Sequence, residues 1–196
     1  MYNYVSGKLV EVTPAYAVID CGGVGYLLEI SLTTYTQIKD MSEVKLLTHF
    51  VVREDAQMLY GFYEEKERTL FRNLVNVNGV GVATARVMLS SFATDELAQA
   101  IVSQDVKTVQ SIKGIGAKTA QRIVLELHDK LGKMDELNIS PVRGGIRGNK
   151  NQEEALSALL ALGFPKSAAE KAVHKIAESE PDATVENIIK MALKML

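Results

Sequence analysis

A nine-residue pattern occurs twice in this 196-residue chain, and no other sequence feature restricts the possible folds as strongly. Residues 77–85 align with residues 112–120 at an offset of 35, and six of the nine positions are identical or exchange Val for Ile. Each copy carries a Gly-x-Gly turn between two short amphipathic stretches, which predicts two helices joined by a tight turn. The middle of the chain is therefore expected to hold two helix-hairpin-helix motifs.

The glycine turns predict a binding site for phosphate groups. Glycine permits a sharp turn and a close approach of two backbones, while Val80 and Ile115 are expected to fill the space between the paired helices. Each turn leaves amide N–H groups at the start of the next helix, where the helix dipole favours an anion. Contacts of this kind hold DNA without reading its bases. We predict DNA contacts at Asn78, Gly79, Val80, Gly81 and Thr84 in the first copy and at Gly114, Ile115, Gly116, Lys118, Thr119 and Arg122 in the second.

The alternative is that both glycine pairs are merely turns between packed helices. Two copies in the same context, with Lys118 and Thr119 after the second, favour DNA binding. The net charge of −2 argues weakly against it, but residues 65–134 hold ten basic and seven acidic side chains, whereas residues 1–64 hold four and eight. The copies differ, because Ala83 stands where Lys118 stands in the second. We expect the first turn to bind through its backbone amides.

An α+β multidomain fold is predicted. Residues 1–63 alternate like strands, and five strands with a helix after the third favour a closed five-stranded barrel of oligonucleotide-binding (OB) type, with a small open sheet as the alternative. Residues 64–132 are predicted to form an all-α tandem helix-hairpin-helix domain. The expected strands are 4–12, 16–20, 24–31, 44–52 and 57–63, and the expected helices are 33–39, 82–91, 95–103 (capped by Thr94), 106–112 and 117–131.

Residues 133–150 are predicted to be a flexible linker, because apolar periodicity fails there and Pro141 and several glycines interrupt it. Residues 151–196 are predicted to form a three-helix domain, with Gly163 ending its first helix. The sequence around Leu162 and Phe164 is similar to the first loop of a ubiquitin-associated (UBA)-like domain. These two side chains are candidates for partner binding or, equally, for closure of the core.

Two adjacent carboxylates, Glu54 and Asp55, lie between the last two predicted strands. Most such pairs are solvated loop charges. If this hairpin faces DNA, it repels phosphates within a Debye length of roughly 8 Å and disfavours continuous duplex relative to a branched centre. Catalytic metal binding by the pair is a weaker alternative, because no further acidic cluster with an associated lysine accompanies them.

No cofactor, metal site or catalyst is predicted. One cysteine, Cys21, excludes an intramolecular disulfide, and three histidines are too scattered to suggest metal ligands. Nucleotide-binding and serine-nucleophile glycine motifs are missing from the sequence. No apolar run reaches the roughly 20 residues of a membrane span, and the first four residues lack the pattern of a secretory signal, so a cytoplasmic location is expected.

The whole chain resembles the RuvA family of bacterial Holliday-junction proteins. The similarity is carried by His49-Phe-Val-Val-Arg-Glu-Asp-Ala-Gln57, Tyr60-Gly-Phe62, Glu67-Arg-Thr-Leu-Phe71 and both glycine turns with Lys118, Thr119 and Ala120. The family commonly has Pro-Lys after the first turn, where this chain has Val82-Ala83, and residues 133–150 match no family motif.

The resemblance implies a homotetramer that binds four-way junction DNA and holds it open, with Glu54 and Asp55 as acidic pins at the crossover. The C-terminal domain, including Leu162 and Phe164, is then expected to recruit a RuvB-type hexameric ATPase, and the RuvC resolvase is a further partner. The implied processes are branch migration, DNA recombination and repair, and the SOS response to DNA damage. The rival readings are a structure-specific nuclease and a general DNA-repair adaptor.

Overall fold

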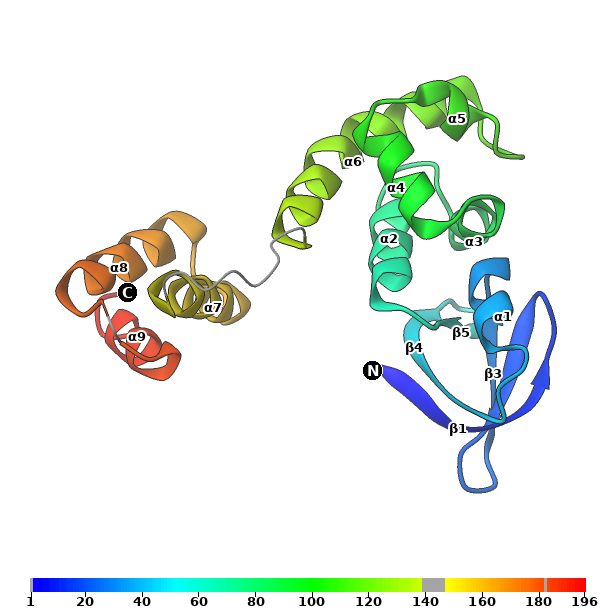
Figure 1. Ribbon diagram of the computed structural model, residues 1–196, viewed down its shortest axis with the longest axis horizontal. Helices are drawn as coiled ribbons and strands as arrows, with labels where there is room; N and C mark the ends of the chain where they lie inside the picture. Colours follow the sequence, from blue (N-terminus) through cyan, green and yellow to red (C-terminus); the bar gives the residue numbers. More distant parts are fainter. Residues whose placement is uncertain (1, 139–146, 182) are drawn as a thin grey trace. The chain divides into compact units, whose positions relative to one another are not determined.

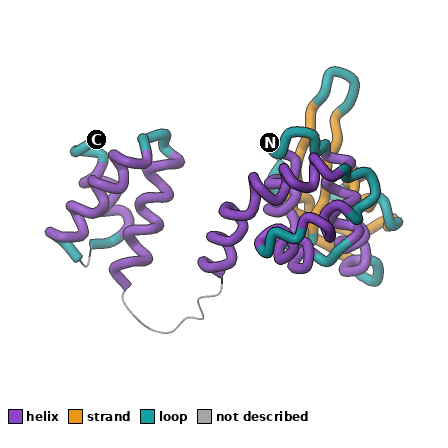
Figure 2. Tube along the Cα trace, turned by 90° about the horizontal axis from the view of Figure 1, so that it is seen from above, coloured by secondary structure: helices purple, strands orange, loops and turns teal. Residues whose placement is uncertain are grey.

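The computed structural model describes residues 2–138, 147–181 and 183–196. The chain divides into two compact units, Met1–Ile139 and Ser140–Leu196, and each has its own apolar core. Among the described residues, all strands belong to the first unit, and the second is built from helices (Figure 2). No helix in the described ranges is long and apolar enough to span a bilayer.

The first unit begins with a closed five-stranded barrel, which confirms the predicted architecture over the open sheet. The strand order is β1-β2-β3-β5-β4, and β3 pairs with β5 in parallel whereas the other neighbours are antiparallel. Closure removes the unpaired strand edges that would invite aggregation. The elements are β1 (Tyr4–Val12), β2 (Tyr16–Asp20), β3 (Gly25–Ile30), α1 (Leu32–Ile38), β4 (Glu43–Val52) and β5 (Gln57–Phe62).

Five helices complete the first unit and contain both glycine turns. They are α2 (Glu65–Val75), α3 (Val82–Ser91), α4 (Thr94–Val102), α5 (Val106–Gln110) and α6 (Ala117–Asn138). The prediction that Thr94 caps α4 is wrong. Thr94 is the first helical residue and is buried, while Ala93 occupies the cap position and its N–H donates to the Glu96 carboxylate at 3.2 Å.

Helical structure extends into both ends of the segment predicted as a linker. Helix α6 passes through Gly132 and ends at Asn138, and α7 begins at Arg147. One glycine inside a helix costs only about 1 kcal/mol, which neighbouring packed residues such as Leu131 offset. Pro141 and the other interrupting residues between positions 139 and 146 lie outside the described residues.

The second unit consists of three helices, as the sequence predicts: α7 (Arg147–Ala161), α8 (Lys166–Ser179) and α9 (Val185–Ala192). Gly163 follows α7 with a φ of +93°, a backbone conformation that glycine adopts readily. Helix α9 is capped by Thr184, whose hydroxyl accepts from the Asn187 N–H at 3.4 Å. A core led by Leu159, Val173 and Ile176 joins the three helices.

The barrel interior has its own core, and the core of the helices also takes in two residues of β5, because α2 packs on β4 and β5; α3 in addition contacts α1 (Figure 1). Phe71 of α2 is fully buried, and its ring centroid lies 5.3 Å from Tyr60 and 4.9 Å from Phe62, both on β5. The base of the helical part is therefore packed directly on the barrel wall.

A buried carboxylate, Glu67, also ties α2 to the barrel. It is 1% exposed, and it accepts hydrogen bonds from the hydroxyls of Ser31 and Thr34, the latter at 2.6 Å. Burial raises the pKa of Glu67 above its ordinary value of 4.5, although these two hydrogen bonds oppose the shift. Removal from water disfavours the charged form of a carboxyl group.

Because its pKa is raised, Glu67 should make the free energy of unfolding of the first unit depend on pH, and Glu67→Gln should remove this contribution. The contribution of a group with a raised folded-state pKa is fully present below its unfolded pKa and is lost as the pH rises through the folded value. The free energy of unfolding of the wild type should therefore fall relative to the variant as the pH rises above about 4.5, by up to about 1.4 kcal/mol per pH unit. Urea denaturation across this range measures the difference, and parallel curves would contradict it.

Candidate nucleic-acid interface

The two glycine turns have the same backbone structure. A hydrogen bond closes each turn, and a second begins the following helix. In the first copy these run from Val80 N to Val77 O (3.0 Å) and from Ala85 N to Gly81 O (2.9 Å); in the second they run from Ile115 N to Ile112 O (3.0 Å) and from Ala120 N to Gly116 O (2.9 Å). The sequence repeat is thus a structural repeat.

Glycine is required in these turns for the first of the two reasons expected, the sharp turn of the backbone. Gly79 and Gly114 have φ values of +93° and +91°, which side chains other than glycine rarely adopt. The second reason, close approach of another backbone, is not met within the chain, because a Cβ built on any of the four turn glycines meets no described atom within 4 Å beyond its own residue and chain neighbours. Gly81 and Gly116 instead leave open space in front of the starts of α3 and α6.

Val80 and Ile115 are each only 5% exposed and belong to the helical core, as predicted for residues that fill the space between helices. Their side chains are therefore not available to a ligand, and their N–H groups already donate to the carbonyls of Val77 and Ile112. The N–H groups that the turns can offer are those in the first turns of α3 and α6, with the positive ends of the helix dipoles behind them.

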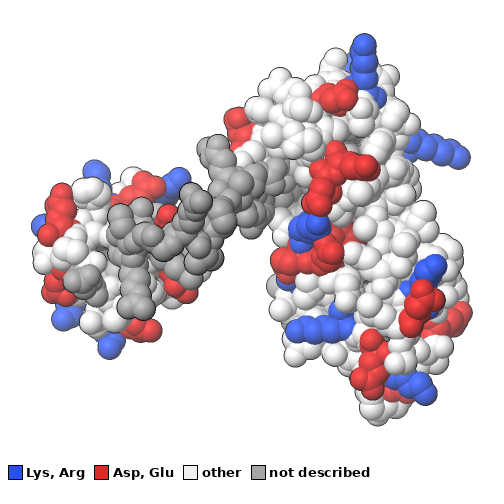
Figure 3. Space-filling view, viewed as in Figure 1, with Lys and Arg blue, Asp and Glu red and all other residues white. Residues whose placement is uncertain are grey.

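Positive charge is concentrated at the second turn. Lys118 is exposed at the start of α6, and Thr119 beside it is half-buried. Basic side chains project into solvent from the end of the unit where α5 and α6 meet (Figure 3). At the first turn the nearest cation along α3 is Arg86, which pairs with Glu29 and donates to the Ala15 carbonyl at 3.2 Å. The first turn therefore lacks an uncommitted arginine on its own helix.

Arg122 connects the two turns. Its guanidinium donates to the Asn78 carbonyl at 3.2 Å, and its Nε lies 3.9 Å from a Glu126 carboxylate oxygen. The Arg122 side chain is half exposed, so it still presents charge to solvent. It reaches from the helix of the second copy to the turn of the first, a contact between residues 44 positions apart that sequence spacing does not reveal.

Lys113 is a basic residue of the second turn that the sequence reasoning omitted. It is exposed immediately before Gly114 and occupies the repeat position of Asn78. The repeat alignment contains the signal, because Lys113 and Lys118 flank the second turn where Asn78 and Ala83 flank the first.

The acidic pair lies at the tip of the β4–β5 hairpin, as predicted. Arg53 N–H donates to the Ala56 carbonyl at 2.8 Å to close the tip, and both Glu54 and Asp55 are exposed. Farther down, Val51 and Met58 pack against the helical core. Within the described residues, no three His, Cys, Asp or Glu side chains lie close enough together to hold a metal ion.

The two candidate partner-binding residues of the C-terminal unit differ in environment. Leu162 is 61% exposed, whereas Phe164 is partly buried against the three-helix core. Packing on the core is thus observed for Phe164, and its role in partner binding stays a prediction. Leu162 remains available at the surface.

Three family models match the chain in succession. Residues 1–61 match the RuvA N terminal domain, residues 71–129 match the SAM-like Helix-hairpin-helix tandem, and residues 150–196 match the RuvA C-terminal domain.

Full-length relatives agree with these matches. The chain is 50% identical over 199 residues to the Holliday junction branch migration complex subunit RuvA of Christiangramia forsetii, and 49% identical to that of Flavobacterium psychrophilum, with both chains covered completely. The RuvA protein of Chlorobaculum tepidum is 42% identical, with 98% of this chain and 96% of the relative covered.

Proposed function

This chain belongs to the RuvA family, and we propose that it binds four-way DNA junctions as a non-catalytic subunit of a branch migration complex. The observation that carries this proposal is the pair of structurally equivalent glycine turns, whose open faces suit phosphate groups. Backbone amides contact phosphates without regard to base identity, so binding is independent of sequence.

The two turns contribute unequally to DNA affinity in this proposal. The second supplies Lys113, Lys118 and Thr119 in addition to its amides, whereas the first supplies amides and Thr84. Arg122 contributes positive charge between the two turns and donates a hydrogen bond to the Asn78 carbonyl. The second turn is therefore the stronger electrostatic contact.

Lys118→Ala is expected to weaken binding to all DNA forms and to reduce the slope of log affinity against log salt by about 0.9, the value for one phosphate neutralised. Ala83→Lys is the matched variant, because it places a cation at the equivalent position of the first turn. It should strengthen binding and steepen the slope by a similar amount. Fluorescence anisotropy over a salt series measures both, and an unchanged slope for Lys118→Ala would remove its phosphate role.

We assign preference for a junction to the acidic hairpin. Glu54 and Asp55 are exposed at the tip, and no group of metal-ligating side chains accompanies them among the described residues. Their negative charge therefore favours repulsion of phosphates as their role. A continuous duplex crossing the tip meets this repulsion. A junction centre leaves room for the acidic tip.

Neutralising both carboxylates with Glu54→Gln and Asp55→Asn is expected to increase affinity for linear duplex by about threefold to tenfold, since a close pair of like charges costs on the order of 1 kcal/mol in water. Affinity for the four-way junction should change less, so selectivity falls. Competition between the two DNA forms at one salt concentration measures the ratio. A ratio equal to that of the wild type would refute the proposed role of the hairpin.

The assembly that we propose is a homotetramer in the cytoplasm that recruits a RuvB-type hexameric ATPase through the C-terminal unit, with the RuvC resolvase as a further partner in recombination, repair and the SOS response. Its support is family membership together with exposed Leu162. Sedimentation with and without junction DNA tests the tetramer. Cleavage of a junction in Mg²⁺ by this chain alone would favour a nuclease, and equal affinity for duplex and junction would favour a general repair adaptor.

A further inference from the structure

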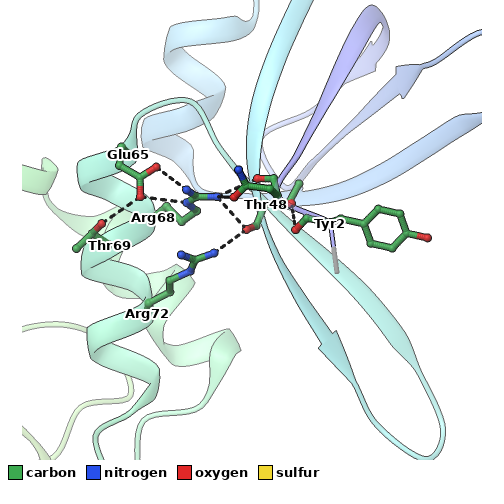
Figure 4. A network of polar contacts seen from close by, with 7 residues as sticks. Tyr2, Thr48, Glu65, Arg68, Thr69 and Arg72 are labelled. Carbon is green, nitrogen blue, oxygen red and sulfur yellow. Dashed lines mark hydrogen bonds and ion pairs between the residues drawn. The ribbon is translucent and has the colours of Figure 1, made fainter. Parts of the chain in front are cut away.

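Two arginines of α2 bond to the barrel wall at one point (Figure 4). Arg68 is 6% exposed, and its Nη1 donates to the backbone and side-chain oxygens of Asn3 at 2.9 and 2.8 Å. Arg72, one turn later, donates to the Thr48 carbonyl of β4 at 3.2 Å. Both contacts join residues at least 24 positions apart in the chain.

Thr48 lies where β4 leaves the β1 ladder. The first residue of β1, Tyr4, pairs with Leu47, so β4 continues beyond that point without β1 beside it. The Thr48 N–H and hydroxyl bond to the carbonyls of Asn3 (2.9 Å) and Tyr2 (2.8 Å), which completes the network. From Thr48 the strand runs directly to the acidic tip at Glu54.

The ionic partner of Arg68 belongs to its own helix. Glu65 accepts from Arg68 Nη2 at 2.6 Å and from Nε at 3.3 Å, and it is the only acidic partner of Arg68 among the described residues. The barrel contributes neutral oxygen acceptors alone. The planar guanidinium can donate at once to the Glu65 carboxylate and to the barrel oxygens in a fixed geometry, which a lysine ammonium cannot do.

Apolar packing does not supply the same constraint. Val51 and Met58 at the hairpin base pack against the helical core, and burial of this kind is not directional. Hydrogen bonds to Asn3 and Thr48 depend on angle and distance, so they resist sliding of β4 along α2. The network therefore fixes the register between the strand and the helix.

We propose that Arg68, supported by Arg72, is a positioning residue that sets the acidic hairpin relative to the first glycine turn and thereby sets junction selectivity. The network cross-links the two by hydrogen bonds, because β4 leads from Thr48 to Glu54 and α2 leads from Arg72 to the turn at Gly79. This inference rests on the proposed function of the hairpin. Arg68, which is buried, acts in this proposal through the hairpin and not by contact with DNA.

A double-mutant cycle with the full chain tests this proposal. Arg68→Met keeps the apolar length but removes every hydrogen bond, and Arg72→Met is a second, half-buried site for use if the first variant is unstable. Lys66→Met is the control, because Lys66 lies on the same helix and pairs with Asp95 away from β4. Each is made in the wild type and in the Glu54→Gln, Asp55→Asn background, and affinities for a four-way junction and a duplex of equal length are measured.

The expected result is a fall of about threefold or more in the junction-to-duplex affinity ratio for Arg68→Met in the wild-type background, with little change where the hairpin is already neutral. Arg68→Lys should not restore the ratio, and Lys66→Met should leave it unchanged. Equal weakening of binding to both DNA forms, or the same fall in the affinity ratio in both backgrounds, would overturn this inference and leave the proposed hairpin function intact. An unchanged ratio on neutralising the hairpin itself would overturn the proposed hairpin function as well.

Discussion

If the proposed function holds, a chain ending after Asn138 is expected to retain its affinity for four-way junctions and to lose all stimulation of the proposed partner ATPase. The two compact units have separate cores, so removal of the second leaves the first complete. The cut is placed after Asn138 because α6 continues to that residue. Junction binding by anisotropy and ATP-driven branch migration with the motor present measure the two activities.

Leu162→Asp in the full chain is the companion to the truncation. The side chain is 61% exposed, so its replacement should not disturb folding, but it places a charge on the proposed docking surface. Motor stimulation should fall while junction binding is unchanged. Stimulation that survives the truncation would show that the motor docks on the first unit instead.

Phe71→Ala is expected to lower the free energy of unfolding of the first unit by about 3–5 kcal/mol, a large share of the 5–15 kcal/mol that is typical of a domain. Phe71 is fully buried, and its ring meets His49 at 5.4 Å in addition to the two aromatic rings of β5. The cavity would open between the barrel and the helices. Urea denaturation measures the loss.

Two controls accompany Phe71→Ala. Phe71→Leu retains most of the apolar volume and should cost considerably less. Leu125→Ala, at a position 82% exposed on α6, should change the free energy of unfolding by no more than about 0.5 kcal/mol. If the alanine variant at position 71 were as mild as that at 125, Phe71 would not be the apolar link between barrel and helices.

The elements that the sequence predicted well are those whose signal is local. Helix α3 matches its predicted range to the residue, because a glycine turn precedes it and apolar periodicity continues through it. The barrel strands agree to within a residue or so at their ends, since their alternating apolar pattern defines them. The predicted cap at Thr94 rests on residue type alone. Residue type does not reveal that Thr94 is buried as the first residue of α4.

The parts that could not be predicted depend on contacts between distant residues. Ser31 and Glu67 are 36 positions apart, and Asn3 and Arg68 are 65 positions apart. Taken alone in the sequence, each of these residues is of a polar type that usually lies at the protein surface. Only the docking of α2 on the barrel turns Glu67 and Arg68 into buried groups with fixed partners.

The Arg122–Asn78 contact has a mechanical consequence for a moving DNA arm. Because it ties one turn to the helix of the other, it holds the two proposed phosphate sites at a fixed separation. A duplex offers equivalent phosphate pairs once per base pair around a helical path, so the smallest displacement that returns such a pair to both proposed sites is a screw motion of one base-pair step. Each such step ends at the same binding energy whatever bases pass, which leaves the direction of travel to an external motor.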